Sequence, residues 1–483
     1  MTSSPSVIPT PVVARGWGWR HASRLAWAVT DLDLRIDAGE RVLLLGSSGS
    51  GKSTLLQAIA GVLGDDEGES VGELLVGGRD PREARGTVGL VLQDPDSQVM
   101  LARVGDDVAF GCENLGVPRD EIWNRVSEAL EAVGLDVPLD HPTTALSGGQ
   151  KQRLALAGVL AMRPGILIFD EPTANLDPDG VKQVRDAVTR VAETTGATLV
   201  IVEHRVAVWR DLVDRVVVLS ADGGVLADGA PDRVLGDRGA ELADAGIWVP
   251  EFPPTVPVRR RGDSSVLESA TGLAVGPARG VIVADEIDLR VESGRVLAIT
   301  GANGAGKSTL GLTLGGLIPA LGGTLDASPL AGGLSAQPYR WASRELLTRV
   351  GTVFQDPEHQ FLARTVRDEL LFGPRLLGYP DADLEAIADD LLARLRLERL
   401  QRANPFTLSG GEKRRLSVAT VLATKPRMLV LDEPTFGQDR TTWIELVGLL
   451  NTLADDGTGI VAITHDAELV DSIADDVYRM GSR

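Results

Sequence analysis

Two glycine-rich segments of the chain have the residue types that hold a phosphate group. They run Gly46-Ser-Ser-Gly-Ser-Gly-Lys-Ser-Thr54 and Gly301-Ala-Asn-Gly-Ala-Gly-Lys-Ser-Thr309. The first follows an expected strand and opens an expected helix at 55–62, which is the context of a phosphate-binding loop. The glycines let backbone N–H groups approach phosphate oxygens, and the helix macrodipole favours negative charge there. The predicted phosphate contacts are Gly46, Ser47, Ser48, Gly49, Ser50, Gly51, Lys52, Ser53 and Thr54, and Gly301, Ala302, Asn303, Gly304, Ala305, Gly306, Lys307, Ser308 and Thr309.

An Asp-Glu pair follows a later apolar run in each half of the chain, at 170–171 and at 432–433. Open α/β sheets bind ligands at the carboxyl ends of their strands, so Asp170 and Asp432 are predicted to hold Mg²⁺ with the hydroxyls of Ser53 and Ser308. The next residues, Glu171 and Glu433, are placed to polarise the attacking water as general bases. Both being present predicts hydrolysis at two sites.

A histidine ends a further expected strand in each half, and these are His204 and His465. Each is predicted to reach a γ-phosphate at the same sheet edge. The segments 93–95 and 146–150 also return, at 355–357 and 408–412. All five matching segments recur in the same order, so the chain contains an internal repeat. The two phosphate-loop lysines lie 255 positions apart, whereas Gln93 and Gln355 lie 262 apart, which indicates seven extra residues in the second copy near 321–341.

These repeats predict an α/β fold with two tandem domains at 1–247 and 267–483. The runs 41–45, 166–169 and 198–202 are typical of buried parallel strands, and 93–146 is expected to be mainly helical, with a helix at 120–133. The proline-rich residues 248–266 are predicted to be an exposed linker that could extend to roughly 60 Å. Its arginines at 259–261 are interpreted as a solvated face, with an anionic-lipid contact as the alternative.

Composition narrows the class of protein. The 483 residues carry a formal net charge of −20, which argues against nucleic acid as the main partner. Cys112 is the only cysteine, so no internal disulfide or cysteine-based zinc cluster can form, and a reducing compartment fits best. No apolar run of about 18 residues is present, so we expect neither a membrane span nor a signal peptide.

The segments Leu146-Ser-Gly-Gly-Gln150 and Leu408-Ser-Gly-Gly-Glu412 carry a resemblance to the ABC ATPases over nearly the whole chain. The resemblance implies two P-loop NTPase domains, each with a RecA-like parallel-sheet core and a helical subdomain, that bind and hydrolyse ATP with Mg²⁺. It also implies an intramolecular head-to-tail dimer, with each ATP between the phosphate loop of one domain and the signature of the other. A serine at the start of a helix can offer its hydroxyl and the helix dipole to a γ-phosphate.

By the same resemblance, each site has a defined set of residues, with Gln93 and Gln355 both catalytic and metal-binding. The first site combines Lys52, Ser53, Gln93, Asp170, Glu171 and His204 with Ser409, Gly410, Gly411, Glu412 and Asp439. The second combines Lys307, Ser308, Gln355, Asp432, Glu433 and His465 with Ser147, Gly148, Gly149, Gln150 and Asp177.

Four further segments resemble the energy-coupling factor ATPases, namely 93–98, 355–360, 106–114 and 433–439. That resemblance implies a peripheral subunit on the cytoplasmic face of the cell membrane. It would power import of a vitamin, a vitamin precursor or a transition-metal ion, and a thiamin-precursor system is the refinement it suggests. Its partners would be a transmembrane coupling subunit and a small substrate-binding membrane protein. Arginines of the coupling subunit are expected to pair with Asp94, Asp96, Asp106, Asp107, Asp356, Glu358, Asp368 and Glu369.

Two alternatives remain open at this point, a monosaccharide-importer ATPase and a ribosome-associated ABC ATPase. One departure from the family pattern concerns the adenine. Trp19 matches the adenine-stacking aromatic, but 271–280 contains no aromatic residue. We therefore expect weaker ATP binding at the second site, unless Tyr339 or Trp341 folds over and replaces the ring.

Overall fold

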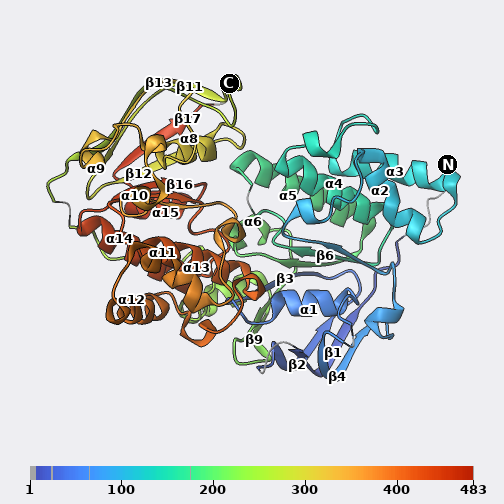
Figure 1. The fold of residues 1–483 in the computed structure, drawn as a ribbon. Coiled ribbons are helices and arrows are strands. Elements are labelled where there is room, and N and C mark those ends of the chain that lie inside the picture. The colour runs from blue at the N-terminus through green and yellow to red at the C-terminus, as the bar shows by residue number, and fades with distance from the viewer. Residues whose placement is uncertain (1–6, 23–25, 65, 175, 261, 482–483) are drawn as a thin grey trace. The chain divides into compact units, whose positions relative to one another are not determined.

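A computed structural model describes residues 7–22, 26–64, 66–174, 176–260 and 262–481. The chain forms two compact units, Met1–Pro253 and Pro254–Arg483, so the expected linker at 248–266 falls partly in each. Each unit contains a parallel sheet, a small antiparallel sheet and a group of helices (Figure 1). This is the tandem α/β fold that the repeated motifs predict.

The parallel sheet of unit 1 has the strand order β5-β6-β7-β3-β8-β9, in which only β9 is antiparallel to its neighbour. Its central strands are mostly aliphatic and buried on both faces, as a parallel sheet covered by helices requires. The phosphate loop follows β3 and the Asp-Glu pair follows β6, so both lie at the carboxyl edge. The strands are β3 (Arg41–Gly46), β5 (Val88–Val91), β6 (Ile166–Asp170), β7 (Thr198–Val202), β8 (Arg215–Leu219) and β9 (Val225–Gly229).

The second sheet of unit 1 is antiparallel, with the order β2-β1-β4. Helices α2, α3 and α4 pack together as a helical subdomain, and the bounds of α3 confirm the helix expected at 120–133. The remaining elements are β1 (Val12–His21), β2 (Val29–Ile36), β4 (Gly68–Val76), α1 (Lys52–Ile59), α2 (Val104–Asn114), α3 (Arg119–Val133), α4 (Gly148–Ala161), α5 (Pro178–Thr195), α6 (Val206–Trp209) and α7 (Gly239–Asp244).

Unit 2 repeats this plan with the parallel order β14-β15-β16-β12-β17 and the antiparallel order β11-β10-β13. The strands are β10 (Val266–Val275), β11 (Ala284–Glu292), β12 (Val296–Gly301), β13 (Gly322–Asp326), β14 (Val350–Val353), β15 (Met428–Asp432), β16 (Gly459–Ile463) and β17 (Asp476–Met480). The helices are α8 (Lys307–Leu314), α9 (Ser328–Ala331), α10 (Ser343–Leu346), α11 (Val366–Leu377), α12 (Asp381–Arg394), α13 (Gly410–Leu422), α14 (Arg440–Asp455) and α15 (Ala467–Ile473).

The extra residues of the second copy form short helices between β13 and β14. Unit 1 has one 3-10 turn, Pro81–Glu83, between the matching strands, whereas unit 2 has α9, the turn Pro338–Arg340 and α10. Trp341 follows this turn, and its ring belongs to the core of unit 2. The insertion therefore adds to the packing of the domain.

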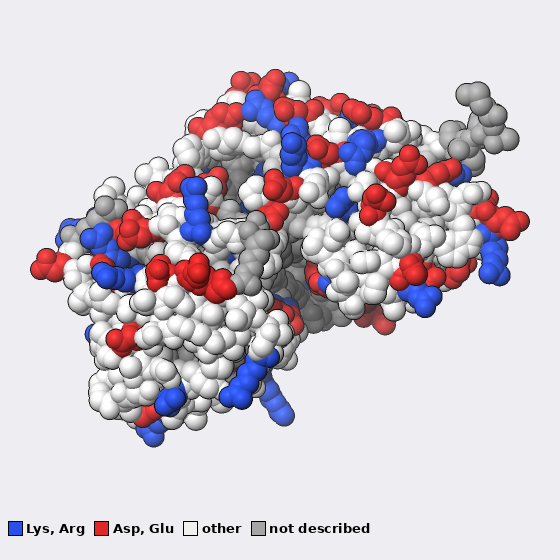
Figure 2. Space-filling model, turned by 90° about the horizontal axis from the view of Figure 1, so that it is seen from above, with Lys and Arg blue, Asp and Glu red and all other residues white. Residues whose placement is uncertain are grey.

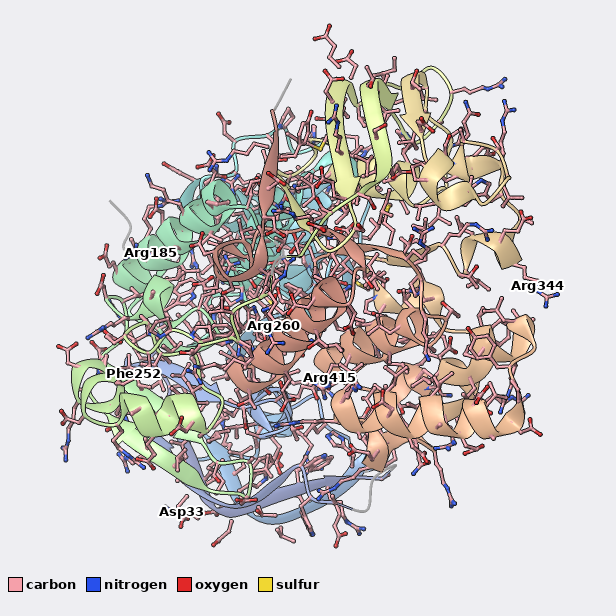
Figure 3. The ribbon with its side chains drawn as sticks, turned by 90° about the vertical axis from the view of Figure 1, so that its left-hand side faces the viewer. Asp33, Arg185, Phe252, Arg260, Arg344 and Arg415 are labelled. Carbon is pink, nitrogen blue, oxygen red and sulfur yellow. The ribbon has the colours of Figure 1, made fainter. Side chains whose placement is uncertain are left out.

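The residues that lead into unit 2 are attached to it, and the interpretation of the arginines as a solvated face is wrong for Arg259. Its side chain is 6% exposed, and its guanidinium pairs at 2.6 Å with Asp475, which is fully buried. The backbone N–H of Arg260 donates to Asp455 at 3.0 Å, and Asn451 donates to the carbonyl of Pro257 at 3.1 Å. Arg261 lies outside the described residues. Asn451 and Asp455 both lie on α14, and Figure 3 labels Arg260.

Candidate active sites

The two phosphate loops have the same local geometry. Gly51 and Gly306 have φ values of +84° and +91°, and a Cβ on Gly51 would lie 2.4 Å from the carbonyl oxygen of Ala28. Glycine is therefore required there on both conformational and steric grounds. Lys52 Nζ donates to the carbonyls of Gly46 at 2.7 Å and Ser47 at 3.0 Å. Lys307 Nζ makes the matching bonds in the second loop, to the carbonyls of Gly301 and Ala302.

The residues expected to hold Mg²⁺ lie together in each unit. The carboxylate of Asp170 accepts a hydrogen bond from Ser53, and that of Asp432 accepts one from Ser308. Burial, followed by the neighbouring charge of Glu171, raises the pKa of Asp170 to about 6. Burial also raises the pKa of Asp432. A hard cation is suited to a hydroxyl and a carboxylate crowded by negative charge, so these donors fit Mg²⁺.

The two candidate bases have an unusual backbone conformation. Glu171 and Glu433 have φ values of +48° and +50°, in the left-handed region that non-glycine residues rarely adopt. Their N–H groups donate to the carbonyls of Val202 at 2.8 Å and Ile463 at 2.9 Å on the neighbouring strands. Holding a residue there costs of order 1–3 kcal/mol, and such strain clusters at active sites. Each glutamate is thus turned out of its strand at the carboxyl edge.

In the first site, the side chains of three predicted residues meet. Gln93 Nε2 donates to Glu171 at 2.8 Å, and His204 Nε2 lies 3.1 Å from the other oxygen of the same carboxylate. Burial opposes charge on Glu171, but the charges of His204 and Lys52 outweigh it, and the pKa of Glu171 is lowered. Burial likewise opposes charge on His204, yet the pKa of His204 is raised by its partner Glu171. The pair therefore favours an ionised glutamate.

The second site uses different contacts around the same residue type. Glu433 accepts from Thr464 Oγ1 at 3.1 Å and from the N–H of His465 at 3.4 Å. The His465 ring lies 4.0 Å from Glu433 and contacts Asn303 of the phosphate loop at 2.9 Å. Burial and the charge of Asp432 raise the pKa of Glu433 to about 7. No hydrogen bond joins the described side chains of Gln355 and Glu433, so the two candidate bases have different contacts.

The signature serines begin long helices. Ser147 caps α4 through a reciprocal pair of bonds with Gln150, and Ser409 caps α13 through the same pair with Glu412. Both serines are exposed, and each Oγ accepts a backbone hydrogen bond while its own proton remains available to donate. The geometry suits phosphate contact, as the resemblance implies.

Asp177 and Asp439, which the same resemblance assigns to nucleotide binding, have a structural role. Each accepts a 2.8 Å bond from a backbone N–H in the first turn of the helix that it caps, α5 or α14.

The aromatic residues near the loops are arranged differently from the sequence expectation. Trp19 is 6% exposed, and its indole N–H donates to His21, whose ring in turn lies 3.2 Å from Thr54 Oγ1. Val275 pairs with β11 at the position where Trp19 pairs with β2, so the ring is absent from unit 2.

Neither candidate replacement is suitably placed. Trp341 is buried in the core and donates its N–H to the Ser335 carbonyl at 2.7 Å. Tyr339 follows Pro338, which packs against Gly316 beyond the end of α8 that is remote from the phosphate loop. The suggestion that either ring folds over the nucleotide is therefore wrong for this structure.

Sequence reasoning missed two buried residues, one in each unit, that occupy equivalent positions next to the candidate sites. Gln152 in unit 1 and Arg414 in unit 2 occupy the same place in the repeat, three residues after the second signature glycine, and both are almost fully buried. The Gln152 amide lies 3.4 Å from the Leu92 carbonyl, whereas Arg414 reaches three carbonyls. Comparing the two copies position by position would have revealed this difference.

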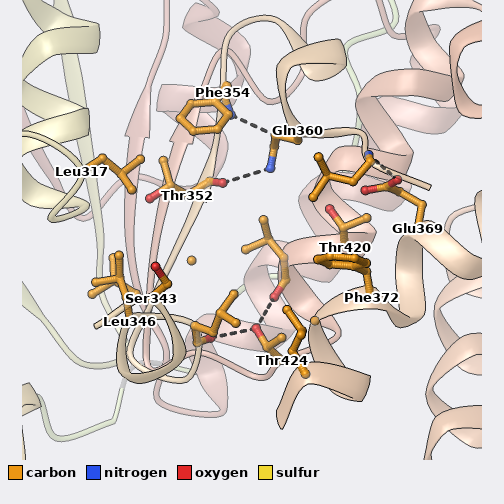
Figure 4. A pocket seen from close by; sticks show the side chains of 17 residues that line it. Leu317, Ser343, Leu346, Thr352, Phe354, Gln360, Glu369, Phe372, Thr420 and Thr424 are labelled. Atoms are coloured by element: carbon orange, nitrogen blue, oxygen red, sulfur yellow. Dashed lines mark hydrogen bonds between the residues drawn. The ribbon is translucent and has the colours of Figure 1, made fainter. Parts of the chain in front are cut away.

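We call the segments 93–98 and 355–360 the Gln loops of units 1 and 2. Beside the Gln loop of unit 2 lies an apolar groove of about 380 Å³ (Figure 4). Leu317, Leu362 and Phe372 contribute exposed side chains to it. Gln360 lies at one edge, where its amide accepts from the N–H of Phe354 and donates to the carbonyl of Thr352, both at 3.2 Å. The second glutamine of the extended Gln loop thus fastens that loop to β14.

Two of the acidic residues expected to face a partner have internal roles instead. Asp107 accepts from the N–H groups of Met100 and Leu101, both at 2.8 Å. Glu369, which is 4% exposed, makes the same pair of bonds to Leu362 and Ala363. Their carboxylates hold the chain before α2 and α11, so the expectation that they pair with a partner's arginines is wrong. Asp106 is exposed, and Figure 2 shows acidic and basic side chains interspersed over one face.

Comparison with known proteins agrees with this geometry. The ABC transporter family profile matches residues 29–174 and 284–436. The chain is 35% identical to "Putative HMP/thiamine import ATP-binding protein YkoD" of Bacillus subtilis, over 92% of this chain and 85% of that protein. It is 33% identical to "Putative ABC transporter ATP-binding protein" of Methanosarcina acetivorans, over 94% and 82%. An archaeal ribosome recycling factor, aABCE1, shares the fold at 20% identity, with a TM-score of 0.62 over 96% of this chain and 87% of that one.

The chain belongs to the ABC transporter family of ATP-binding proteins, and it is an ATPase. No helix among the described residues is both long and apolar enough to cross a membrane.

Proposed function

We propose that this chain is the ATP-hydrolysing subunit of an energy-coupling factor type importer for a vitamin, a vitamin precursor or a transition-metal ion. It would act at the cytoplasmic face of the membrane, with a transmembrane coupling subunit and a small substrate-binding membrane protein as partners. The YkoD relative is named for import of HMP and thiamine, which supports a thiamin precursor as the cargo.

The observation that carries the proposal is a set of apolar side chains exposed at equivalent positions in both units. Val62, Met100 and Phe110 of unit 1 match Leu317, Leu362 and Phe372 of unit 2, and all six are exposed. Exposed apolar clusters mark interaction sites, and a repeated cluster beside each Gln loop fits a partner with two similar docking elements. We call these six residues the paired apolar patches.

In this proposal each ATP lies between the phosphate loop of one unit and the signature of the other. Lys52 and Lys307 bind the β and γ phosphates, and Ser147 and Ser409 contact the γ phosphate from the opposite unit. Ser53 with Asp170, and Ser308 with Asp432, would hold Mg²⁺, which would supply positive charge to neutralise the phosphates. Glu171 and Glu433 orient the attacking water, while His204 and His465 contact the γ phosphate. Gln93 and Gln355 complete the two sites and link them to the patches.

The experiment replaces apolar residues of the patches with aspartate and measures assembly. Phe110→Asp with Phe372→Asp is expected to abolish copurification with the membrane partners and uptake of labelled thiamin precursor, while ATPase activity of the isolated chain remains. Tyr339→Asp is the matched control, because Tyr339 is exposed but does not line the groove. Wild-type copurification by the double variant would contradict the proposed docking surface.

A further inference from the structure

Arg414 is a buried cation at the back of the second site. It lies on α13 and is 3% exposed. Its guanidinium donates to the carbonyls of Phe354 at 2.6 Å and Asp432 at 3.3 Å, and also to that of Gln355. Phe354 and Gln355 lead out of β14 into the Gln loop, and Asp432 ends β15. One side chain thus connects the Gln loop, the metal-binding strand and the helix that begins at the signature serine.

Unit 1 provides an internal comparison. Gln152 lies in the corresponding place, and its amide makes one long bond of 3.4 Å, to the Leu92 carbonyl. There the Gln loop is held by its own side chain, since Gln93 donates to Glu171 at 2.8 Å. In unit 2 Arg414 binds the backbone of the loop, and Gln355 has no hydrogen bond to Glu433 among the described residues. Both copies also fasten the loop to its strand through its second glutamine, Gln98 or Gln360. The copies therefore differ in the Gln93–Glu171 bond and in the contacts of Arg414.

Burying a guanidinium is costly unless its donors are matched, and no carboxylate lies within ion-pair distance of Arg414 among the described residues. Its Nε has no hydrogen-bond partner there either. An apolar side chain or a glutamine, as in unit 1, would fill this place at lower cost. The arginine reaches three carbonyls, whereas the glutamine of unit 1 reaches one.

We propose that Arg414 is a positioning residue of the second site, which sets Gln355 and Asp432 in one geometry and transmits movement of the Gln loop to the metal-binding strand. The first site has no equivalent link and responds to its Gln loop through the Gln93–Glu171 contact. The inference rests on ATP hydrolysis by this chain and not on the importer assignment, so failure of that assignment leaves it standing.

The test uses the full chain in two backgrounds. Glu171→Gln slows the first site, so the remaining turnover reports on the second, and Glu433→Gln does the reverse. In the Glu171→Gln background, Arg414→Gln is expected to lower kcat roughly tenfold with less than a twofold change in KM. The reason is that a misplacement of about 1 Å can cost up to about 100-fold in rate. Gln152→Ala in the other background is the matched control, with an expected change below about threefold, because it removes one long bond.

A second measurement does not depend on turnover. With both glutamates replaced and ATP bound, Mn²⁺ affinity can be read by electron paramagnetic resonance. Arg414→Gln is expected to weaken one of two bound ions severalfold, and Gln152→Ala to leave both unchanged. Adding Gln355→Ala to Arg414→Gln is expected to lower kcat little further, because residues that act through one another are not additive.

Two results would overturn the proposal. One is an Arg414→Gln chain whose kcat and Mn²⁺ affinity both stay within twofold of the parent. The other is a variant with a lower melting temperature that loses activity equally in both backgrounds, which would reduce Arg414 to a folding role.

Discussion

Gln93 donates a 2.8 Å hydrogen bond to the candidate base Glu171, whereas the corresponding side chains of the second site, Gln355 and Glu433, are not joined. The first candidate base is therefore hydrogen-bonded to the Gln loop, and the second to Thr464 and His465. The two copies of the motifs thus carry different hydrogen-bond networks around their candidate bases, so each site can be tested with its own variants.

Replacing both bases should separate ATP binding from hydrolysis. We expect Glu171→Gln with Glu433→Gln to bind ATP normally and to lower turnover by roughly 100- to 10,000-fold, because removal of a general base affects only the transition state. Steady-state ATPase assays and nucleotide titration measure the two properties. Turnover close to that of the wild type would refute the assignment of the bases.

The second site should bind ATP more weakly than the first. His21 lies beside the first phosphate loop and is supported by the buried ring of Trp19, whereas Val275 stands at the Trp19 position in unit 2. Loss of base stacking is worth roughly 1 to 3 kcal/mol, a factor of about 5 to 150 in dissociation constant. Titration of Lys52→Ala, which leaves the second site, against Lys307→Ala, which leaves the first, measures the difference.

Two tryptophan variants test the cause of this difference. Trp19→Ala should reduce it, by weakening the first site. Trp341→Ala should leave nucleotide affinity unchanged but destabilise unit 2 by about 3 to 5 kcal/mol, because it removes a large core side chain. Equal affinities in the two lysine variants, unaffected by Trp19→Ala, would show that stacking does not separate the sites.

Glu268 should make unit 2 less stable as the pH rises. It is fully buried in β10, both carboxylate oxygens lack a hydrogen-bond partner among the described residues, and burial raises its pKa well above the usual value. A raised pKa in the folded state means that the stability gained from the proton is present at low pH. That stability is lost between the ordinary pKa and the raised one, at up to about 1.4 kcal/mol per pH unit.

The matched variant is Glu268→Val, because Val12 of unit 1 pairs with Ile36 as Glu268 pairs with Val291. We expect this variant to remove the pH-dependent loss, so its advantage in urea unfolding should be small near pH 4 and larger at pH 8. A constant difference across that range would argue that Glu268 does not titrate as its burial predicts.

Replacing Glu369 should lower the stability of unit 2, because its carboxylate has a role inside the unit. Glu369→Ala leaves two partly buried N–H groups, those of Leu362 and Ala363, without their acceptor, at a cost of about 1 kcal/mol. Thermal unfolding should therefore show a lower midpoint for unit 2. Asp106→Ala is the control, because Asp106 is exposed, and it should change the midpoint little. An unchanged midpoint in Glu369→Ala would contradict the internal role.

Much of the fold could be predicted because the relevant patterns are local. The strand at 198–202 and the helix at 120–133 were expected from short apolar runs and helical spacing, and β7 and α3 confirm them. The phosphate loops were equally accessible, because glycine spacing and the lysine define them without reference to the rest of the chain.

What could not be predicted depends on contacts between distant segments. Arg259 was expected to be solvated, since an arginine run in a proline-rich segment usually is, but Asp475 lies more than 200 residues away and buries it. Glu369 was expected to face a partner, yet it accepts bonds from its own preceding loop. The left-handed φ of Glu171 has no signal in its residue type.

The attachment of Pro257 and Arg259 to unit 2 shortens the tether between the two halves. Phe252 packs against Gly239 of unit 1, so the chain from Phe252 to Pro257 spans at most roughly 18 Å rather than the roughly 60 Å of the expected linker. A short tether gives its two ends an effective concentration in the millimolar range when their geometry permits contact. Any association of the two halves would then be a unimolecular step, insensitive to dilution of the protein.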